Sequence, residues 1–273
     1  MMQGDNGERS IIDLALMEQS VDQIYSLLAK ASQAILDIYQ YGHFNIERKH
    51  DNSPVTEADL QSNVIITEGL KKLFSHIPII SEEATIQDYK ERINWEWLWL
   101  LDPLDGTKEF VKHTDEFTIN LALIHNHKVV AGFLYIPIQN GMYFAIQGKG
   151  AFQYKADGHH LRLSVSNFTL DQKNIRVVIS KNHKDQATQS YIDVLNEPIL
   201  IEKGSAIKFV SIAKGETDYY PRMIHIMEWD TAAGQILIEE AGGQLVEATS
   251  GKSLRYNKPT MVNPYFIASG KIL

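Results

Sequence analysis

The sequence predicts an α+β fold in two parts: a larger β-rich part that begins with helices, and a smaller part in which strands and helices alternate. Apolar residues recur at steps of three and four between residues 14 and 38, the period of a helix with one buried face. Segments rich in β-branched and aromatic residues follow between residues 117 and 146. Strands alternate with helices after residue 175, so we expect a domain of residues 1–165 and a second α/β domain of residues 166–273.

The first part opens with a helix that has a regular apolar face. The apolar positions are Leu14, Met17, Val21, Ile24, Leu28, Ala31, Ile35 and Ile38. The repeat stops at Gly42, which favours one long core-facing helix over a coiled coil. A loop is predicted at residues 51–54, because proline disfavours helix in the residue before it. Thr56 and Asp59 form a typical start for a second helix that runs to about Phe74.

Strands account for most of the remaining first part. They are predicted at residues 77–81, 95–101, 117–124, 129–135 and 142–146, and the Asp157-Gly158 turn closes this part. The second part is predicted to contain strands at residues 175–179 and 199–202, helices at residues 186–195, 206–214 and 230–241, and two terminal strands.

The composition excludes several classes of function. Apolar residues make up 44% and charged residues 22% of the 273 residues, as in ordinary globular proteins. The sequence contains no run of eighteen apolar residues, the length needed to span a membrane. The absence of cysteine excludes disulfides and thiolate chemistry. Met1 to Ser10 lack the features of a signal peptide, so we expect a cytoplasmic protein, with peripheral association at the inner membrane left open.

The charge of the chain limits its partners. A net charge of −8 argues against a nucleic-acid partner, because the protein's field would repel a phosphate backbone. A small anionic substrate remains compatible where bound metal ions supply local positive charge. The sequence does not define an oligomeric state.

The strongest local motif is an acidic turn at the end of an apolar strand. It reads Asp102-Pro103-Leu104-Asp105-Gly106-Thr107 and carries two carboxylates three residues apart. Such a turn can direct both carboxylates and the Leu104 carbonyl toward one point, and hard oxygen ligands of this kind suit Mg²⁺. Taken alone, the motif is equally compatible with an ordinary Asp-Gly surface turn.

Two further acidic sites strengthen the metal interpretation. Glu82-Glu83 follows another apolar strand, and acidic residues at consecutive strand ends can converge on one edge of a sheet. Asp230 begins an apolar-faced helix that ends near Gly242-Gly243, so it lies where backbone N–H groups also favour phosphate. The simpler alternatives are a solvated loop for the glutamate pair and helix capping for Asp230.

Together these residues resemble the signature of the inositol monophosphatase-like superfamily, the lithium-sensitive, magnesium-dependent phosphatases. The parts that match in order and spacing are Asp59, Glu82-Glu83, Asp102 to Thr107, and Trp229-Asp230 taken with Gly242-Gly243. The match extends over almost the whole chain and is specific because four separate parts agree. The resemblance implies a layered αβαβα sandwich of the sugar-phosphatase type and two or three Mg²⁺ ions as cofactors.

Within this superfamily the chain is most similar to the 3′(2′),5′-bisphosphate nucleotidases of the bacterial sulfate-assimilation type. The supporting segments are residues 52–56, Lys108-Glu109-Phe110, 116–120, Tyr220-Pro221-Arg222 and 228–233. The resemblance implies a nucleotide bisphosphate substrate, adenosine 3′,5′-bisphosphate (pAp), which loses its 3′-phosphate to give AMP. Conversion of 3′-phosphoadenosine 5′-phosphosulfate to adenosine 5′-phosphosulfate is a further candidate reaction. Residues 180–183 and 223–226 depart from the pattern, in the half expected to contact the nucleotide.

Other functions stay open at this point. One alternative is an inositol monophosphatase or another small sugar-phosphate phosphatase, because all of these would share the same metal core. A second alternative, from a different class, is a non-catalytic protein that senses nucleotides with the same fold. The presence of every expected metal ligand argues against this last interpretation.

The resemblance also implies which residues hold metal ions. Glu82, Asp102 and the Leu104 carbonyl would bind a first Mg²⁺ ion that activates water. Asp102, Asp105 and Asp230 would bind a second ion beside the leaving oxygen. Two such ions about 3.5–4 Å apart can stabilise both the attacking and the leaving oxygen of an in-line displacement.

The same resemblance assigns the remaining catalytic roles. Asp59 and Thr107 would form a dyad in which the carboxylate orients the hydroxyl and the hydroxyl accepts a proton from the water. Glu82 joins them as a predicted catalytic residue through its metal ion. The N–H groups of Gly106 and Thr107 could bind phosphate oxygens, because glycine permits a close approach of the backbone.

Contacts to the rest of the substrate are predicted in the second part of the chain. Gly204-Ser205 precedes a helix containing Lys208 and could present N–H groups and a cation to the ribose or the second phosphate, although a plain strand-to-helix turn is an equal alternative. Arg222 is a candidate contact of the 5′-phosphate. The complete set of predicted substrate contacts is Glu82, Leu104, Asp105, Gly106, Thr107, Gly204, Ser205, Lys208, Arg222 and Asp230.

Two other patterns are better explained by structure than by function. His125 and His127 resemble a metal-binding pair, but they fall in the turn between two predicted strands, which favours a plain hairpin. Trp95, Trp97 and Trp99 follow the alternation of a strand, which favours packing over a platform for stacking bases.

Overall fold

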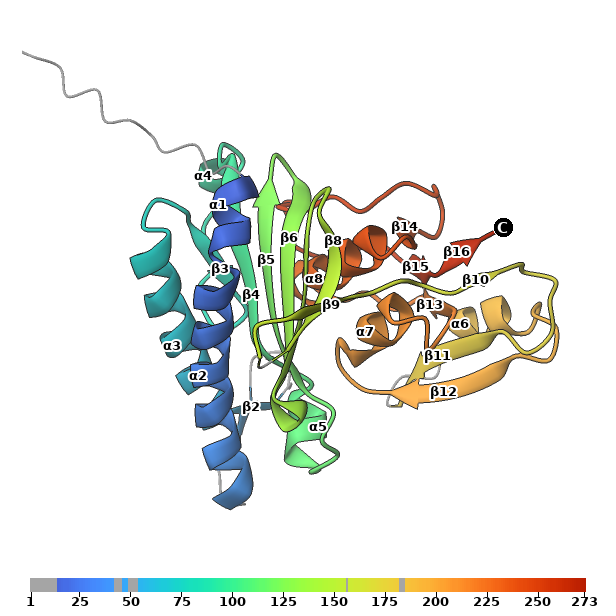
Figure 1. The fold of residues 1–273 in the computed structure, drawn as a ribbon, viewed down its shortest axis with the longest axis horizontal. Helices are drawn as coiled ribbons and strands as arrows, with labels where there is room; N and C mark the ends of the chain where they lie inside the picture. The colour runs from blue at the N-terminus through green and yellow to red at the C-terminus, as the bar shows by residue number, and fades with distance from the viewer. Residues whose placement is uncertain (1–13, 42–45, 49–53, 156, 182–184) are drawn as a thin grey trace, which may run out of the picture.

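A seven-stranded sheet forms the centre of the first part of the chain (Figure 1). The structure, a computed structural model, describes residues 14–41, 46–48, 54–155, 157–181 and 185–273. β3 and β4 are parallel, and each later pair is antiparallel. The strands, in spatial order, are β3 (Ile79–Ser81), β4 (Trp97–Asp105), β5 (Thr118–His125), β6 (Lys128–Ile136), β7 (Gly141–Ile146), β8 (Gly150–Tyr154) and β9 (His160–Arg162).

Helices cover one face of this sheet. Trp99 and Leu101 of β4 pack against them, together with alternate residues of the neighbouring strands. The single helix predicted from residue 14 onward is interrupted at Ser20, whose hydroxyl donates to the carbonyl of Leu16 (2.8 Å). A serine that hydrogen-bonds to the preceding turn often bends a helix, and the apolar face continues across the interruption. The helices on this face are α1 (Leu14–Gln19), α2 (Val21–Tyr41) and α3 (Glu57–Leu73).

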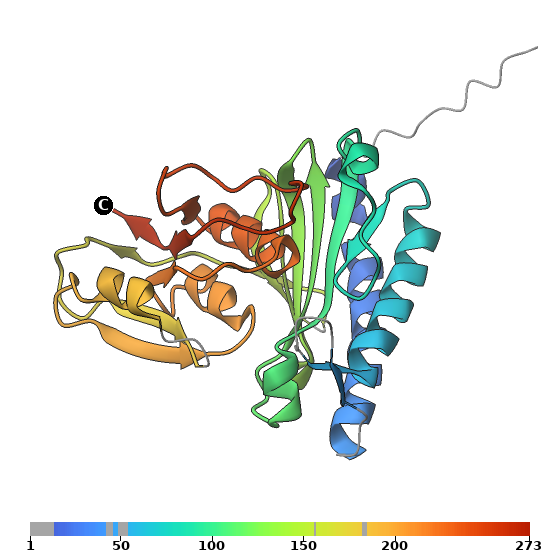
Figure 2. The ribbon, with the colours of Figure 1, turned by 180° about the vertical axis from the view of Figure 1, so that it is seen from behind.

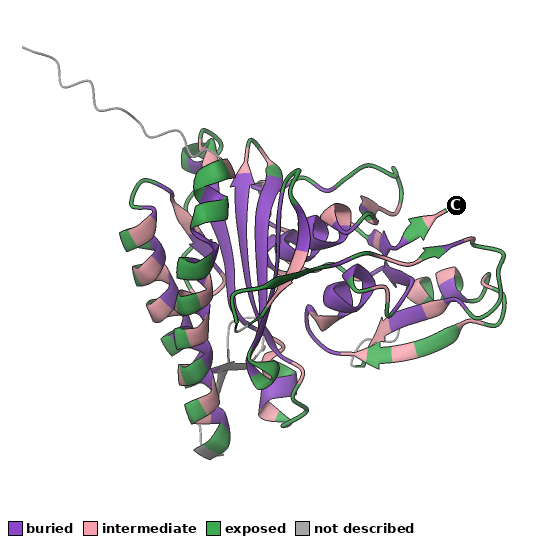
Figure 3. Cartoon of the chain, in the orientation of Figure 1, coloured by how far each residue is buried: buried purple, intermediate pink, exposed green. Residues whose placement is uncertain are grey.

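The opposite face of the sheet is covered by α7 (Ile207–Ala213) and α8 (Glu228–Glu240). Leu98 and Leu100 of β4 point to this side, alternating with the residues that face α2 and α3. Because both faces are buried, the central strands are almost continuously apolar, as Figure 3 shows. α8 lies very close to β6, since a Cβ atom added to Gly132 would come within 2.8 Å of the Cα atom of Ala233.

A second sheet, of five strands, packs on the other side of α7 and α8. Its outer face is covered by α6 (Gln186–Ile192) through a small apolar cluster around Val177 and Tyr219. The layers therefore alternate helix, sheet, helix, sheet, helix, and the predicted αβαβα sandwich is confirmed (Figure 2). The strands, in spatial order, are β12 (Ile199–Lys203), β11 (Arg176–Ser180), β13 (Tyr219–Arg222), β15 (Phe266–Ser269) and β14 (Gln244–Glu247).

Short elements connect the layers. They are β1 (Ile46–Arg48), β2 (Pro54–Thr56), α4 (Tyr89–Arg92), α5 (Thr107–Val111), η1 (Pro137–Gln139), β10 (Asn167–Phe168) and β16 (Lys271–Ile272). β1 pairs with β2, and β10 pairs with β16 near the chain end. One apolar core runs from the seven-stranded sheet through α7 and α8 into the five-stranded sheet. The division of the chain at residue 165 stays a prediction.

The structure corrects several predicted boundaries. β4 continues to Asp105 instead of ending at Leu101, and α8 begins at Glu228, so Asp230 is its third residue and Met227 takes the N-cap position. β8 and β9 were not predicted from the sequence. Gly42 and most of the predicted loop at residues 51–54 lie outside the described residues.

The histidine pattern behaves as predicted, and the tryptophan pattern does so for Trp97 and Trp99 but not for Trp95. His125 and His127 lie in and beside the turn between β5 and β6, where the ring of His125 stacks on Trp97. Trp99 is fully buried, although Trp95 precedes β4 and is not part of the strand alternation. None of the described helices combines the length and the apolar character needed to cross a bilayer. The cytoplasmic location stays a prediction.

Candidate metal and substrate site

The acidic turn lies at the end of β4 and is shaped by a bulge. Asp102 pairs with Asn120 of β5, but the register shifts before the next pair, Asp105 with Thr118. The N–H of Leu104 donates to Asp102 Oδ1 (3.0 Å), which fixes that carboxylate within the bulge. Pro103 is tolerated here because β3 ends opposite Leu101, so this stretch of β4 has no neighbour on that side that needs an N–H donor.

Three carboxylates from different elements converge beside this turn. The N–H of Glu82 donates to the carbonyl of Leu101 (3.1 Å), so the parallel pairing of β3 and β4 brings Glu82 to the same sheet edge as Asp102. Asp230 reaches the cluster from the first turn of α8, where its Oδ2 accepts from the N–H of Met227 (2.8 Å). One oxygen from each of Glu82, Asp102 and Asp230 lies within 4.8 Å of the others.

Asp105 connects this cluster to the second part of the chain. Its Oδ2 accepts from the hydroxyl of Ser205 (2.7 Å) and from the side-chain amide of Asn120 (3.3 Å). The Ser205 hydroxyl also lies 2.7 Å from that of Thr118. One oxygen of Asp105 is therefore held firmly by polar partners from both parts of the chain.

The carboxylate cluster is electrostatically unfavourable without a cation. Burial raises the pKa of Asp102 well above its usual value, and the charges of Glu82, Asp105 and Asp230 raise it further. Burial likewise raises the pKa of Asp230, as do the charges of Asp105 and Glu82. A divalent cation would relieve this repulsion, and carboxylate and carbonyl oxygens are the ligands that Mg²⁺ takes. The donor set therefore fits Mg²⁺.

The predicted dyad of Asp59 and Thr107 is in hydrogen-bond contact. The hydroxyl of Thr107 donates to Asp59 Oδ1 (3.1 Å), and it lies 3.4 Å from the carbonyl oxygen of Leu104. The other oxygen of Asp59 accepts from the N–H (2.8 Å) and the hydroxyl (2.6 Å) of Thr56. Burial nevertheless raises the pKa of Asp59. Asp59 thus takes both roles considered for it, as part of a capping box and as the partner of Thr107.

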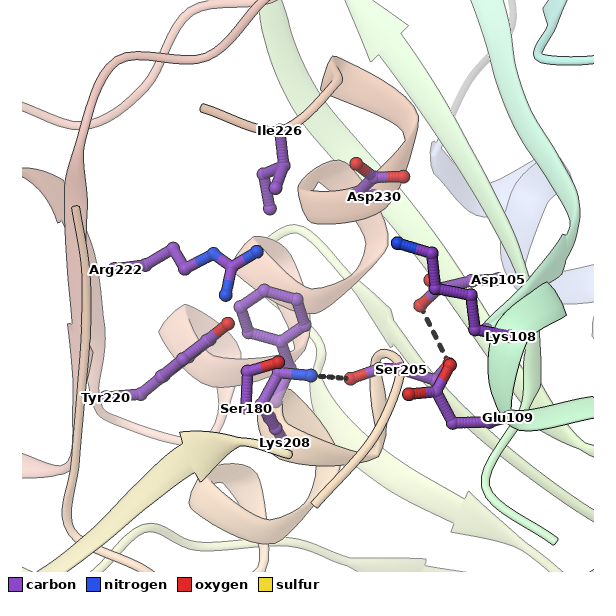
Figure 4. A pocket seen from close by; sticks show the side chains of 12 residues that line it. Asp105, Lys108, Glu109, Ser180, Ser205, Lys208, Tyr220, Arg222, Ile226 and Asp230 are labelled. Atoms are coloured by element: carbon purple, nitrogen blue, oxygen red, sulfur yellow. Dashed lines mark hydrogen bonds between the residues drawn. The ribbon is translucent and has the colours of Figure 1, made fainter. Parts of the chain in front are cut away.

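A second cavity adjoins the carboxylates and contains two buried cations (Figure 4). It encloses about 200 Å³, beside a cavity of about 250 Å³ over the carboxylates. Lys208 is 7% exposed, and its Nζ donates to the carbonyl of Ser205 (2.6 Å). Arg222 is also 7% exposed, and its Nε has no hydrogen-bond partner among the residues that the structure describes. Two buried cations that line one cavity favour an anionic ligand.

Burial also shifts the pKa values of Lys208 and Tyr220, which line this second cavity. It lowers the pKa of Lys208 to about 8, an effect that the charge of Asp105 opposes and that of Arg222 reinforces. The Nζ of Lys208 lies 5.7 Å from the ring centroid of Tyr220, and burial raises the pKa of that phenol to about 12. Tyr220 therefore stays a neutral hydrogen-bonding group at neutral pH.

Of the two glycines predicted to contact substrate, Gly106 lines the cavities and Gly204 does not. Gly106 has a φ of 95° and lines both cavities, and a Cβ atom there would lie 2.9 Å from the carbonyl oxygen of Glu116 and 3.1 Å from the Cβ atom of Ser205. Gly204 lies outside the lining of both cavities, and its N–H donates to the carboxylate of Glu116 (2.8 Å). The prediction that the Gly204 N–H is presented to substrate is therefore not supported.

Several residues that line the cavities are not among the predicted site residues. The side chain of Lys108 extends from α5 toward the space between Asp105 and Asp230, and it lines both cavities (Figure 4). The Lys108-Glu109-Phe110 segment was singled out as a mark of resemblance, and that signal could have identified Lys108 as a site residue. The remaining residues of this kind are Glu109, Ser180, Phe209, Tyr220 and Ile226.

The fold and the site together define a class of protein: a layered α+β protein with a cluster of carboxylates, whose oxygens fit a divalent cation, at the edge of its larger sheet. Comparison with known families then makes the assignment specific. The chain belongs to the inositol monophosphatase family, whose model matches residues 17–272.

The relatives of the chain include bacterial nucleotidases. It is 38% identical over 252 residues to the 3′(2′),5′-bisphosphate nucleotidase CysQ of Escherichia coli O157:H7, covering 91% of this chain and 99% of that protein. The crystal structure of CysQ from Bacteroides thetaiotaomicron superposes with a TM-score of 0.77 at 35% identity, covering 90% of this chain and 94% of that one.

A more distant structure shares the fold alone. An IMPase/NADP phosphatase, crystallised with Mg²⁺ and phosphate, gives a TM-score of 0.77 at 22% identity and covers 94% of this chain and 92% of that one.

Proposed function

We propose that this chain is a Mg²⁺-dependent 3′(2′),5′-bisphosphate nucleotidase, a phosphoric monoester hydrolase that converts pAp to AMP and phosphate. The observation that carries the proposal is that the cavity over the carboxylates adjoins a second cavity, called here the basic cavity because Lys208 and Arg222 line only this one. The two cavities share Asp105, Gly106, Lys108, Glu109 and Asp230. A substrate with two phosphates would place one over the carboxylates and the other against the buried cations. The two CysQ relatives described above support the same substrate class.

The metal ions would be held by the groups that the sequence singled out. Glu82, Asp102, the Leu104 carbonyl, Asp105 and Asp230 are the proposed ligands, for two or three ions. Bound Mg²⁺ lowers the pKa of water and neutralises charge on phosphate oxygens. The protein holds the ligands in place through neighbouring donors, the N–H groups of Leu104 and Met227 and the hydroxyl of Ser205 among them.

Asp59 and Thr107 would move the proton of the attacking water. The Thr107 hydroxyl gives its own proton to Asp59 Oδ1, 3.1 Å away, and accepts one from the water. The raised pKa of Asp59 makes its carboxylate a better acceptor than an exposed aspartate. Thr56 holds the other oxygen of Asp59, so the carboxylate cannot turn away.

Lys208 and Arg222 would bind the 5′-phosphate. Both are buried in the basic cavity, and a phosphate would satisfy the unpartnered Nε of Arg222. A charge-assisted hydrogen bond is worth about 1.5–3 kcal/mol, so each one lost should cost roughly tenfold or more in kcat/KM. Discrimination between substrates must arise here, because the carboxylate centre treats every scissile phosphate alike.

The test compares kcat/KM for pAp, 3′-AMP and inositol 1-phosphate in the wild type, Arg222→Ala and Lys208→Met. We expect the wild type to prefer pAp, and each variant to lose about tenfold or more on pAp with little change on 3′-AMP, which lacks the 5′-phosphate. Equal turnover of inositol 1-phosphate and pAp would instead identify a sugar phosphatase. No Mg²⁺-dependent turnover of any of the three would favour a non-catalytic nucleotide sensor.

A further inference from the structure

A long, mostly exposed segment between β3 and β4 contains α4 and one buried arginine. Within residues 83–96, all of which the structure describes, only Arg92 is buried, at 2% exposure. Its Nη1 donates to Asn257 Oδ1 (2.7 Å) and to the carbonyl of Lys258 (3.0 Å), and its Nη2 donates to the carbonyl of Pro259 (2.9 Å). A planar guanidinium that makes several such bonds at once fixes the direction as well as the position of its partners.

The segment that receives Arg92 is held from the other side by α8. Glu228, the first residue of α8, is 0% exposed, and its carboxylate accepts from the N–H groups of Asn257 (2.5 Å) and Lys258 (2.9 Å). The ammonium of Lys258 lies 2.6 Å from the same carboxylate. The Nδ2 of Asn257 also donates to the carbonyl of Arg92 (2.7 Å). The backbone of Asn257 has a φ of 59°, in the left-handed region.

These contacts join the two elements that carry opposite sides of the carboxylate cluster. The loop of Arg92 leaves the sheet directly after Glu82, and Glu228 stands two residues before Asp230. Glu82 itself is placed by the pairing of β3 with β4, whereas the position of Asp230 follows the first turn of α8, to which Glu228 belongs.

We propose that Arg92, Asn257 and Glu228 form a brace that fixes the first turn of α8, and with it Asp230, relative to the loop that follows Glu82, which makes them positioning residues for Mg²⁺. The inference rests on the proposed function through its metal site. A buried carboxylate that binds two consecutive backbone N–H groups has little freedom to shift, and it passes this rigidity to the first turn of α8. Loss of a partner that hydrogen-bonds a metal ligand directly typically costs about 10–100-fold in metal affinity, and because the brace acts one contact further out we expect the lower end of this range.

A purely structural brace would change stability but not metal affinity, so the test measures both. Asn257→Gly removes the side-chain bonds to Arg92 and suits the left-handed backbone at that position. Glu228→Gln keeps the shape of the side chain but loses its charge and an acceptor for a backbone N–H. The matched control is Asp218→Asn, because Asp218 is a buried carboxylate bonded to Arg176 and Ser166 away from the site.

The experiment titrates Mg²⁺ into the substrate-free proteins by calorimetry and records Tm without metal. We expect the Kd for Mg²⁺ to rise about tenfold or more in Asn257→Gly and Glu228→Gln, whereas Asp218→Asn lowers Tm and changes Kd by less than about twofold. Unchanged Kd values in both brace variants would overturn the brace and leave the metal site standing. A wild type that binds no Mg²⁺ would overturn the metal site and, with it, the brace.

Discussion

Replacing Asp102 with asparagine should remove activity and yet stabilise the metal-free protein. Asp102 is 1% exposed, and one of its oxygens lies within 4.8 Å of oxygens of Glu82 and Asp230. Asparagine keeps the shape of the side chain and an oxygen that can accept from the N–H of Leu104. It removes the negative charge, which relieves the repulsion in the cluster and at the same time takes a ligand from Mg²⁺.

The size of the effect follows from Coulomb's law. Two full charges 4.8 Å apart at an effective dielectric constant of about 20 repel by about 3.5 kcal/mol. Burial and the neighbouring carboxylates raise the pKa of Asp102 and of Asp230, which favours their neutral forms without metal, so the repulsion is smaller than this figure for full charges. We expect Asp102→Asn to gain about 1–2 kcal/mol in the free energy of unfolding, or roughly 2–4 °C in Tm for each kcal/mol.

The gain should depend on pH in a defined direction. A carboxyl whose pKa is raised by folding stabilises the protein when protonated, in acid, and loses that contribution as the pH rises through the folded pKa. The wild type should therefore approach the variant in acid, where Asp102 is neutral. The difference in Tm should widen as the pH rises and Asp102 ionises.

Thermal melts with EDTA or Mg²⁺, together with turnover of pAp, test the reasoning. Mg²⁺ should raise the Tm of the wild type but not of Asp102→Asn, and kcat should fall at least about a thousandfold, equivalent to about 4 kcal/mol. As a control, Asp218→Asn should lower the Tm, because that carboxylate is paired with Arg176. A metal-free Asp102→Asn protein that melts below the wild type would refute the account and show that Asp102 is mainly structural.

Three further predictions concern the chemistry of the site. Thr107→Val should lower kcat by about 10²–10⁴-fold and leave the Mg²⁺-induced rise in Tm intact, whereas Thr107→Ser should recover most of the lost activity. If the Tm of Thr107→Val no longer rises with Mg²⁺, Thr107 has a metal-binding role instead. At pH values above about 8, KM for pAp should increase because Lys208 loses its proton, and Lys208→Arg should flatten this increase because arginine stays charged. The same pH dependence of KM for 3′-AMP would exclude Lys208 as the cause. Millimolar Li⁺ and millimolar Ca²⁺ should both inhibit turnover of pAp, Ca²⁺ because it prefers longer bonds and more ligands than Mg²⁺. Full activity in millimolar Li⁺ would contradict the expected lithium sensitivity.

The proposed metal ligands could be located from sequence because short motifs carry most of them and because those motifs together resemble a known family. Asp102 and Asp105 share one turn at the end of an apolar strand, and Glu82 follows a strand that pairs with it. Asp59 lies three residues after Thr56, where a capping box can form and hold its carboxylate. Periodicity and turn chemistry determine these positions without knowledge of the remaining fold.

The rest depends on contacts between distant residues. The hydrogen bond between Arg92 and Asn257 spans 165 positions, and no local pattern predicts it. The sequence predicts a strand that ends at Leu101, before Pro103, but β4 continues to Asp105, because a missing N–H costs little where no strand lies alongside. Gly204 was expected to face the substrate, and its N–H is instead taken by Glu116, 88 positions away.

The position of α8 between the two sheets limits how the protein can open and unfold. Its side chains belong to an apolar core shared by both sheets, and Gly132 leaves no gap between α8 and β6. A hinge between the halves would have to expose this core, so we expect substrate to enter and product to leave past side chains at the rim, such as Lys108, while the two sheets stay together. For the same reason, residues 1–165 produced alone should aggregate, and heating the whole chain should give one cooperative transition.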